Sequence, residues 1–327
     1  MRRIKKVMTT VSYSPEDLQS LRELFPDSEF VALNIRDTPG VMEALKDADV
    51  AILPGDIDPR FLGENQLKWI HCDHAGLARS ARPEIFERGI LLSGSAGRSS
   101  PVLAEHCLYF MLNACYHTKE LLRAQKAHHW GVKDQDSWRG LYGRKVGIIG
   151  FGNNGKQLAD RLHACGMEII AYDRYPIEGY DYIQTKLCSG NGDRIEQLLE
   201  QVDFIVLCVA LTNETHHMLN RETFASVKPG AVLVNMSRGE LVDTEAMIEA
   251  LDKGILSCAG LDVFEKEPLP EDSPLWDRED VYITPHVTPQ VPHRTGRSLE
   301  IIRENVMRYQ QELPLLNQVT AKDVWTK

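Results

Sequence analysis

A glycine motif between Lys145 and Asp173 constrains this 327-residue chain more than any other stretch. The apolar run Lys145-Val-Gly-Ile-Ile leads into Gly150-Phe-Gly-Asn-Asn-Gly155, a G-x-G-x-x-G pattern, and a helical stretch follows over 154–164. Asp173 closes the next apolar run, 18 residues after Gly155. The first glycine of such a pattern permits a tight turn, the second lets a pyrophosphate approach the backbone, and the third lets helix and strand pack closely. The spacing therefore predicts a strand–turn–helix–strand unit that binds a dinucleotide.

The residues at the end of the second run indicate which dinucleotide binds. The Asp173 carboxylate can accept hydrogen bonds from both ribose hydroxyls, whereas a 2′-phosphate there would meet a like charge. Free N–H groups and a partial positive charge at the start of the helix favour the pyrophosphate. We therefore predict NAD as the cofactor. Arg174 leaves NADP open as the alternative, since a guanidinium can bind a phosphate.

Apolar runs alternate with helical stretches along most of the chain. Five such runs lie before residue 100, and six sharper ones begin at Lys145. Strands that alternate with helices form parallel sheets covered on both faces. We predict the α/β class, with doubly wound parallel sheets and a Rossmann fold in the second set of runs.

The net charge of the chain and the spacing of its cysteines indicate which binding partners and which cellular compartment to expect. The formal net charge is −10, from 37 basic and 47 acidic residues, which argues against nucleic acid or an anionic membrane as the main partner. The seven cysteines are dispersed and form no C-x-x-C pair, as expected for free thiols in a reducing compartment. No run approaches the roughly 18 apolar residues of a membrane span. We predict a cytoplasmic protein.

A long apolar stretch lies between the two sets of runs. It opens at Ser100-Pro101, and proline suits the first turn of a helix. We predict one helix from Val102 to about Arg123, apolar almost all round and therefore buried on most sides, between domains or at a subunit interface. Residues 127–142 break the pattern and predict an extended arm, anchored by Trp130 and Trp138.

Three charged or titratable side chains follow late runs of the second set. Arg238 follows the run that ends Val234-Asn-Met, Glu267 lies in LDVFEKEPLP, and His286 closes VYITPH. Ligands of open α/β sheets bind at the carboxyl ends of the strands. Reduction of a 2-keto acid needs a cation for the substrate, a proton donor and a group that stabilises the protonated donor. Arg238, His286 and Glu267 fit these roles in that order.

These segments closely resemble the D-isomer-specific 2-hydroxyacid dehydrogenase family. The resemblance is carried by VGIIGFGNNG, KPGAVLVNMSRGELVD, CAGLDVFEKEPLPEDSPLW and VYITPH, and also by SSPVLAEH and LKWIHCDHAGL. It covers nearly the whole chain. It implies a Rossmann NAD-binding domain (101–293) inserted in a flavodoxin-like substrate domain (1–100 and 294–327). It also implies a homodimer built on the long helix and the arm.

The resemblance also assigns site residues. It gives the catalytic roles to Arg238, Glu267 and His286. It implies that the substrate lies against His74, Ala75 and Gly76, with Arg238 and His286 completing the substrate site; the N–H groups of Ala75 and Gly76 bind the anion. The implied cofactor contacts, of which the first lies against the nicotinamide, are Val102, Gly150, Phe151, Gly152, Asn153, Asn154, Gly155, Asp173, Arg174, Cys208, Val209, Ala210, Thr215, Met236, Ser237 and Asp262.

The chain departs from the family pattern at four places. Asn154 stands where the glycine motif usually has Ile, and Ala210 where a proline is usual. Thr288 replaces a small residue after the catalytic histidine, and the substrate loop reads Ala-Gly-Leu-Ala from Ala75 rather than Ala-Gly-Val-Asp. These changes leave the chemistry intact but leave the substrate open.

Other polar residues have two interpretations each. His71 and His74 flank the substrate loop. Either they contact a polar substrate, or they are surface histidines with satisfied hydrogen bonds. Arg79 and Arg98 either bind a phosphate or second carboxylate or lie in solvent. We expect both to be solvated. The adjacent pairs His128-His129 and His216-His217 point to different faces and make poor metal sites, so we predict no metal.

Three functions therefore compete. The first is reduction of glyoxylate, hydroxypyruvate or a related 2-keto acid. The second is a phosphoglycerate dehydrogenase-like activity, for which Arg79 and Arg98 would have to face the cleft. The third is an NAD-sensing scaffold of the corepressor kind, against which the complete Arg–Glu–His set argues. We predict the first.

Overall fold

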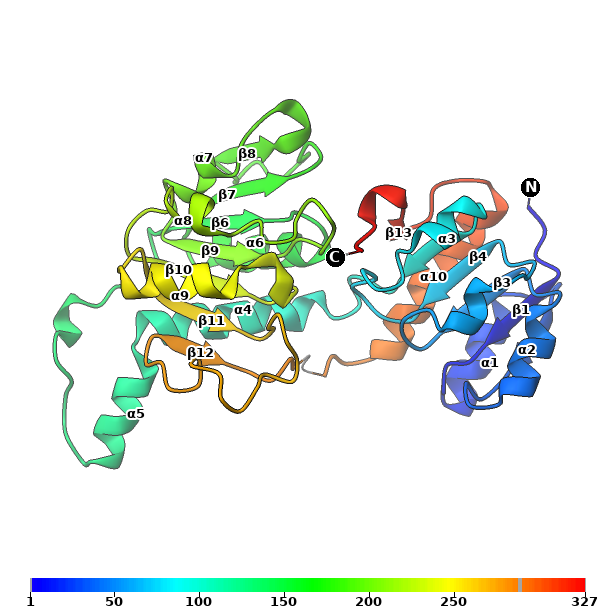
Figure 1. Cartoon of the computed structure of the whole chain (residues 1–327), viewed down its shortest axis with the longest axis horizontal. Helices are drawn as coiled ribbons and strands as arrows, with labels where there is room; N and C mark the ends of the chain where they lie inside the picture. Colours follow the sequence, from blue (N-terminus) through cyan, green and yellow to red (C-terminus); the bar gives the residue numbers. More distant parts are fainter. Residues whose placement is uncertain (1, 288–289, 327) are drawn as a thin grey trace. The chain divides into compact units, whose positions relative to one another are not determined.

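The computed structural model of the chain describes residues 2–287 and 290–326, so the departure at Thr288 lies outside the described residues. The chain divides into two compact units (Figure 1). Unit 1 consists of Met1–Ser99 and Gln290–Lys327, and unit 2 of Ser100–Pro289. None of the helices in the described part of the chain is long and apolar enough to cross a lipid bilayer.

Unit 2 contains a seven-stranded parallel sheet. Its strands are β6 (Lys145–Ile149), β7 (Glu168–Asp173), β8 (Thr185–Cys188), β9 (Phe204–Leu207), β10 (Ala231–Asn235), β11 (Leu256–Leu261) and β12 (Val281–Ile283). They lie in the order β12-β11-β10-β9-β6-β7-β8. This order reverses between β6 and β9, as in a Rossmann fold, where the reversal marks the ligand site. The prediction of six strands missed β8, whose four residues, TKLC, give no clear alternation.

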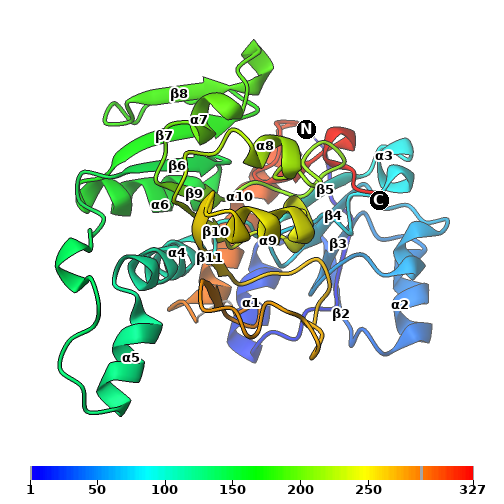
Figure 2. The same cartoon turned by 60° about the vertical axis from the view of Figure 1, so that its left-hand side comes forward.

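The helices of unit 2 precede or connect these strands. They are α4 (Ser100–Cys115), α5 (Thr118–Lys126), α6 (Asn153–Ala164), α7 (Glu196–Leu199), α8 (Arg221–Phe224) and α9 (Thr244–Asp252). α6 follows the glycine motif and buries Leu158, Ala159 and Leu162 against the sheet. Figures 1 and 2 both show α5 projecting away from that sheet.

The prediction of one continuous helix from Val102 to Arg123 is wrong. α4 ends at Cys115 and α5 begins at Thr118, because the backbone of His117 between them is left-handed, with φ 44°. Such a residue cannot continue a right-handed helix. Burial on most sides holds for α4, of which only Glu105, Tyr109 and Leu112 are exposed, but is wrong for α5, which has no buried residue.

Unit 1 contains a six-stranded sheet. Its strands are β1 (Lys6–Thr9), β2 (Glu29–Ala32), β3 (Val50–Leu53), β4 (Trp69–Cys72), β5 (Leu91–Gly94) and β13 (Gln318–Val319). The order is β13-β5-β4-β3-β1-β2, and only β13 pairs antiparallel. The five parallel strands follow the flavodoxin-like order. The two-residue β13 was too short to detect in the sequence.

The sheet of unit 1 is covered on both faces, as the alternation predicts. Its helices are α1 (Pro15–Glu23), α2 (Thr38–Leu45), α3 (Pro83–Glu87) and α10 (Arg294–Gln310). Neighbouring residues of one strand belong to different cores: Met8 packs in one apolar cluster and Val7 in another. Successive side chains of a strand point to opposite faces, so both sides of this sheet are apolar.

Candidate functional site

The glycine motif forms the turn between β6 and α6. The backbone of Gly150 has φ +94°, and a Cβ there would lie 2.6 Å from Val209 N, so only glycine fits. A Cβ on Gly155 would lie 2.2 Å from the carbonyl oxygen of Gly150, so strand and helix meet too closely for a larger residue. A Cβ on Gly152 would meet nothing within 4 Å. The turn is therefore closely packed at Gly150 and Gly155 and open at Gly152. This arrangement fits a pyrophosphate at the start of α6.

Asn154, the departure from the family pattern, joins α6 to α4. Its Oδ1 lies 2.5 Å from the hydroxyl of Ser100, at the first residue of α4. A polar side chain here is satisfied by a hydrogen bond, which offsets the cost of burying it. The same first turn of α4 carries Val102, which is half-buried.

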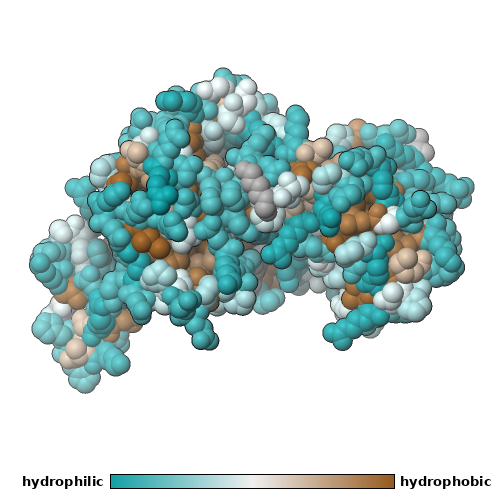
Figure 3. Space-filling view, viewed as in Figure 1, coloured by the Kyte–Doolittle hydropathy of each residue, from teal (hydrophilic) through white to brown (hydrophobic). Residues whose placement is uncertain are grey.

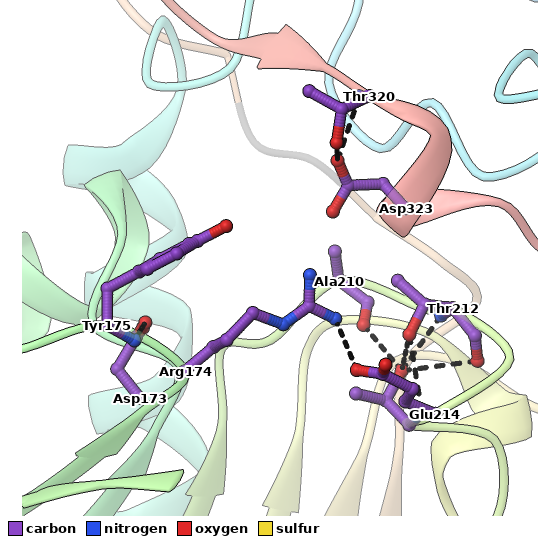
Figure 4. A network of polar contacts seen from close by, with 9 residues as sticks. Asp173, Arg174, Tyr175, Ala210, Thr212, Glu214, Thr320 and Asp323 are labelled. Carbon is purple, nitrogen blue, oxygen red and sulfur yellow. Dashed lines mark hydrogen bonds and ion pairs between the residues drawn. The ribbon is translucent and has the colours of Figure 1, made fainter. Parts of the chain in front are cut away.

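Asp173 lies at the end of β7 and faces the glycine turn. Its Oδ2 accepts a hydrogen bond from Phe151 N at 2.6 Å, and its Oδ1 accepts one from Tyr175 N at 3.0 Å. These bonds fix the carboxylate beside the glycine turn. Arg174, the next residue, points toward the loop after β9, and its Nη2 lies 2.8 Å from Glu214 Oε2 (Figure 4).

The loop after β9 begins with Cys208, Val209 and Ala210, three of the predicted cofactor contacts. Cys208 and Val209 are half-buried and Ala210 is exposed. Thr215, another predicted contact, holds the loop: its hydroxyl donates to the Ala210 carbonyl at 2.8 Å and accepts from Thr212 N at 2.8 Å (Figure 4).

The loop after β10 carries Arg238. Ser237 donates to the carbonyl of Leu207 at 2.9 Å, which ties this loop to the end of β9, and Met236 is buried. The half-buried Arg238 donates from Nη1 to its neighbour's carbonyl, Ser237 O, at 2.6 Å.

His286 and Glu267 form a pair at the same edge of the sheet. His286 Nδ1 lies 2.7 Å from Glu267 Oε2, and Glu267 Oε1 accepts from Phe264 N at 3.0 Å. His286 follows β12 and Glu267 follows β11, which are adjacent parallel strands. The side chains of His286 and Glu267 are 45% and 34% exposed. Nε2, the other ring nitrogen, is then the atom available to a bound molecule.

A close backbone contact joins the loop of Arg238 to the loop of Glu267. A Cβ on Gly239 would lie 1.9 Å from the backbone carbon of Phe264. Gly239 follows Arg238, and the N–H of Phe264 binds Glu267. Only glycine permits this approach, so the segment Arg238-Gly239 packs directly on the backbone that orients Glu267.

Asp262 holds the backbone of His286 in place. His286 has a left-handed backbone, with φ 50°, and its N–H donates to the carbonyl of Asp262 at 2.9 Å. The Asp262 side chain accepts from Thr284 Oγ1 at 2.5 Å and from Val287 N at 2.8 Å. Burial raises the pKa of Asp262, and the Thr284 hydrogen bond opposes that rise. A strained turn of this kind persists when neighbours hold it.

Thr284 and His106 were missed by the sequence reasoning. His106 Nε2 of α4 lies 3.2 Å from Thr284 Oγ1. Because Thr284 donates to Asp262, its oxygen accepts from Nε2–H of His106. The signal for Thr284 was present, two residues before His286 in VYITPH. His106 is 178 positions away from Thr284, so only the fold reveals it.

The predicted substrate loop lies in unit 1, after β4. Ala75 and Gly76 are exposed, and Gly76 has φ +77°. His74 is partly buried, with its Nε2 3.6 Å from Asp56 Oδ1. A Cβ on Gly94 of β5 would lie 2.8 Å from the His74 carbonyl, so the loop packs closely on the end of that strand. The exposed residues Ala75 and Gly76 are thus at the carboxyl edge of the unit 1 sheet.

Both interpretations of His71 are wrong. It is fully buried, and its ring nitrogens lie 3.0 Å from the hydroxyls of Ser93 and Ser95. Burial lowers the pKa of His71 to about 4, so the ring is neutral at physiological pH. In a period-2 strand its side chain points into the sheet packing, away from any surface.

The expected solvation of Arg98 is also wrong, whereas Arg79 is exposed as expected. Arg98 is 8% exposed, and its Nη1 donates to Asp73 Oδ1 at 2.7 Å and to the Ser298 hydroxyl at 3.0 Å. A buried cation requires a paired anion, and Asp73 supplies it. Arg98 therefore stabilises the folded structure of unit 1.

The predicted orientation of His216 and His217 is wrong, because their rings stack with centroids 4.0 Å apart. The left-handed backbone of His217, with φ 50°, brings the two side chains to one side. His217 Nε2 lies 2.6 Å from Glu265 Oε1. Within residues 2–287 and 290–326, no cluster of three or more His, Cys, Asp or Glu side chains has metal-binding geometry.

Comparisons with known proteins agree on one family. The model of the family "D-isomer specific 2-hydroxyacid dehydrogenase, NAD binding domain" matches residues 108–288. A glyoxylate reductase of Korarchaeum cryptofilum is 32% identical over 295 residues, 86% of each chain. A glyoxylate/hydroxypyruvate reductase B of Yersinia pseudotuberculosis is 33% identical over 280 residues, 84% of each chain.

A solved structure extends the similarity to the fold. The D-isomer specific 2-hydroxyacid dehydrogenase of Xanthobacter autotrophicus, solved in complex with NADPH and MES, is 26% identical. It has a TM-score of 0.80 and covers 98% of this chain and 99% of its own.

Proposed function

The chain belongs to the D-isomer specific 2-hydroxyacid dehydrogenase family, and on that premise we propose that it reduces glyoxylate or hydroxypyruvate with NADH, using Arg238, Glu267 and His286. Family membership makes it an oxidoreductase that transfers a hydride between a nicotinamide cofactor and a 2-hydroxy acid. The 2.7 Å pair of His286 and Glu267, at the edge where β11 and β12 end, carries the catalytic assignment.

His286 acts as the proton donor in this proposal. Its Nδ1 is bound by Glu267, so Nε2–H donates the proton to the substrate's carbonyl oxygen during reduction. The negative charge of Glu267 stabilises the imidazolium that precedes this transfer. The dinucleotide supplies the hydride when bound.

The proposal names substrate-binding residues in each unit, taken by itself. Unit 2 is the NAD-binding domain and supplies Arg238, whose guanidinium binds the substrate's carboxylate and polarises its carbonyl. Unit 1 is the substrate domain and supplies the backbone N–H groups of Ala75 and Gly76, two exposed residues, with His74 next to them in the chain. The single positive charge of the Arg238 guanidinium matches the single negative charge of the carboxylate of a small 2-keto acid.

The competing functions find less support. A phosphoglycerate dehydrogenase-like activity required both Arg79 and Arg98 at the cleft, and Arg98 is buried on Asp73. A scaffold has no need of the His286–Glu267 pair. Both curated relatives described above are named as reductases of glyoxylate.

A panel of 2-keto acids with NADH and NADPH tests the proposed activity. We expect the absorbance of the reduced nicotinamide to fall with glyoxylate or hydroxypyruvate. The panel includes pyruvate and a phosphorylated 2-keto acid as comparison substrates. Turnover confined to the phosphorylated acid, or none with any acid, would overturn the proposal.

Preference for NADH rests on Asp173. Its carboxylate lies beside the glycine turn, where it can accept from ribose hydroxyls and repel a 2′-phosphate. The solved relative from Xanthobacter autotrophicus binds NADPH, so the preference has to be measured in this chain. An Asp173→Ala variant should lose discrimination against NADPH, and an unchanged preference would refute the ribose role.

The proposal includes a homodimer built on α4, α5 and the arm. Tyr109 and Leu112 lie on one face of α4, and Tyr116 directly follows that helix. Leu122 and Trp130 extend the apolar surface, and all five residues are exposed in the single chain. Figure 3 shows hydrophobic residues among hydrophilic ones over α5 and the following segment. Exposed apolar residues of this density are typical of interfaces. Light scattering should give the dimer mass, and Leu122→Glu should lower it to the monomer's.

Two further observations concern the proposed dimer and the proposed cellular location. Trp138 stacks on His117, with ring centroids 4.8 Å apart, so it anchors the arm, whereas Trp130 is fully exposed and is available to a second subunit. The seven cysteines are free thiols, which fits a cytoplasmic location.

A further inference from the structure

We infer that Glu214 is a second determinant of dinucleotide choice, which acts by binding the guanidinium of Arg174 and so denying it to a 2′-phosphate. The inference rests on the proposed preference for NADH and adds to Asp173 a residue that sequence reasoning had not considered. Glu214 lies 40 positions from Arg174 in the chain, on the loop after β9.

The position of Arg174 makes it the natural ligand for a 2′-phosphate. It directly follows Asp173, whose carboxylate is fixed beside the glycine turn by the N–H groups of Phe151 and Tyr175. In dinucleotide-binding folds an arginine near that acidic position accommodates the 2′-phosphate of NADP. On its own, Arg174 would therefore weaken the selectivity that Asp173 provides.

Glu214 counteracts Arg174 by contact and by charge. Arg174 Nη2 and Glu214 Oε2 are 2.8 Å apart, and the Arg174 side chain is 28% exposed (Figure 4). A charge-assisted bond at this distance directs the guanidinium toward the loop after β9. Asp173, fixed on the glycine turn, and Glu214, bound to Arg174, together set two negative charges against the one positive charge of Arg174. The group keeps a net negative charge, which disfavours a phosphate more than a ribose hydroxyl.

The loop holds Glu214 where it meets Arg174. Residues on both sides of it are bound internally: Thr212 N donates to Thr215 Oγ1 at 2.8 Å, and Thr215 Oγ1 donates to Ala210 O at 2.8 Å. These bonds lie within the loop, and Figure 4 shows them beside the Arg174–Glu214 contact. The Glu214 side chain is 74% exposed, so its replacement leaves no cavity.

The alternative is an ordinary surface ion pair with no effect on cofactor choice. Exposed pairs contribute only about 0–1 kcal/mol to stability, so both interpretations predict a folded, stable Glu214→Gln variant. They differ in what the variant does to NADPH. Glu249 supplies a matched control, because it pairs with Arg221 at 2.7 Å and lies on α9, outside the glycine turn.

The experiment compares NADH and NADPH in the wild type, Glu214→Gln and Glu249→Gln. We measure the dissociation constants by quenching of tryptophan fluorescence, and kcat/KM with glyoxylate. Glu214→Gln should improve NADPH relative to NADH by about fivefold, the change that an exposed charge pair supports. Glu249→Gln should leave the ratio unchanged. The gain should disappear in the double variant Arg174→Ala/Glu214→Gln.

The results separate this inference from the proposed function. A ratio that changes by less than about twofold in Glu214→Gln, or as much in Glu249→Gln, would overturn the role of Glu214. So would a gain that survives the loss of Arg174. Absence of turnover with glyoxylate would count against the proposed substrate alone, because the dissociation constants still test Glu214.

Discussion

The Glu267→Gln substitution tests the proposed proton donor most directly. Glu267 has two hydrogen-bond donors to satisfy: His286 Nδ1–H on Oε2 at 2.7 Å, and Phe264 N–H on Oε1 at 3.0 Å. Glutamine has a single acceptor oxygen. If that oxygen stays on Phe264, an NH2 group faces His286 and the imidazolium loses its acceptor. If it turns to His286, the buried donor of Phe264 meets another donor.

The structure also sets the size of the effect. Hydrogen bonds to charged groups contribute about 1.5–3 kcal/mol. The His286 and Glu267 side chains are 45% and 34% exposed, so water screens the pair and the lower end of that range applies. A loss of about 1.5 kcal/mol from the transition state corresponds to about a tenfold fall in kcat.

The assay is steady-state reduction of glyoxylate by NADH at neutral pH, with the dissociation constant of NADH measured alongside. Glu265→Gln is the matched control, because Glu265 lies in the same loop and pairs with His217 at 2.6 Å. We expect Glu267→Gln to lose about tenfold in kcat with unchanged NADH binding, and Glu265→Gln to stay within about twofold. An unaltered kcat in Glu267→Gln, or an equal fall in both variants, would refute the reasoning.

Three further predictions concern the same fold. His286→Ala should lower kcat for reduction by about a hundredfold or more while NADH still binds, and near-normal turnover would refute the acid role. Gly239→Ala should abolish turnover and lower the melting temperature, because the new Cβ would lie 1.9 Å from the Phe264 backbone; an active, stable variant would contradict that contact. Burial raises the pKa of Asp49, but bonds from Lys68 and backbone N–H groups outweigh it and bring the pKa below the ordinary 3.8. Asp49 therefore stabilises unit 1 above that pH, and the stability is lost as pH falls through its lowered pKa. Asp49→Asn should lower the free energy of unfolding by about 2 kcal/mol at pH 7, and denaturant titrations should show the difference shrinking as the pH falls below 3.8.

The geometry of the glycine turn, the candidate cofactor site, was largely predictable because its parts are close in sequence. The strand, the three glycines, the helix and Asp173 form one continuous segment, and each glycine has a local geometric reason. The late strands of unit 2 were equally clear from their apolar runs, and the residues that follow them lie at one edge of a parallel sheet. The His286–Glu267 pair could therefore be expected from two positions 19 apart.

The errors share a different cause. The sequence predicted a solvated Arg98 because arginines are mostly exposed, but Asp73 and Ser298 bury it. It predicted one long helix because apolar composition carries no sign of the left-handed turn at His117. In each case the deciding interaction depends on the path of the backbone through space.

By itself, the sequence determined the dinucleotide turn, the α/β class and the family, because local spacing and hydrophobic periodicity are properties of neighbouring residues. Only the tertiary structure decided which partner each charged side chain takes. Glu214 meets Arg174, and His106 supports Thr284, across 40 and 178 positions. Such pairings depend on which strands become neighbours in the sheet, and burial of the whole apolar core selects that order.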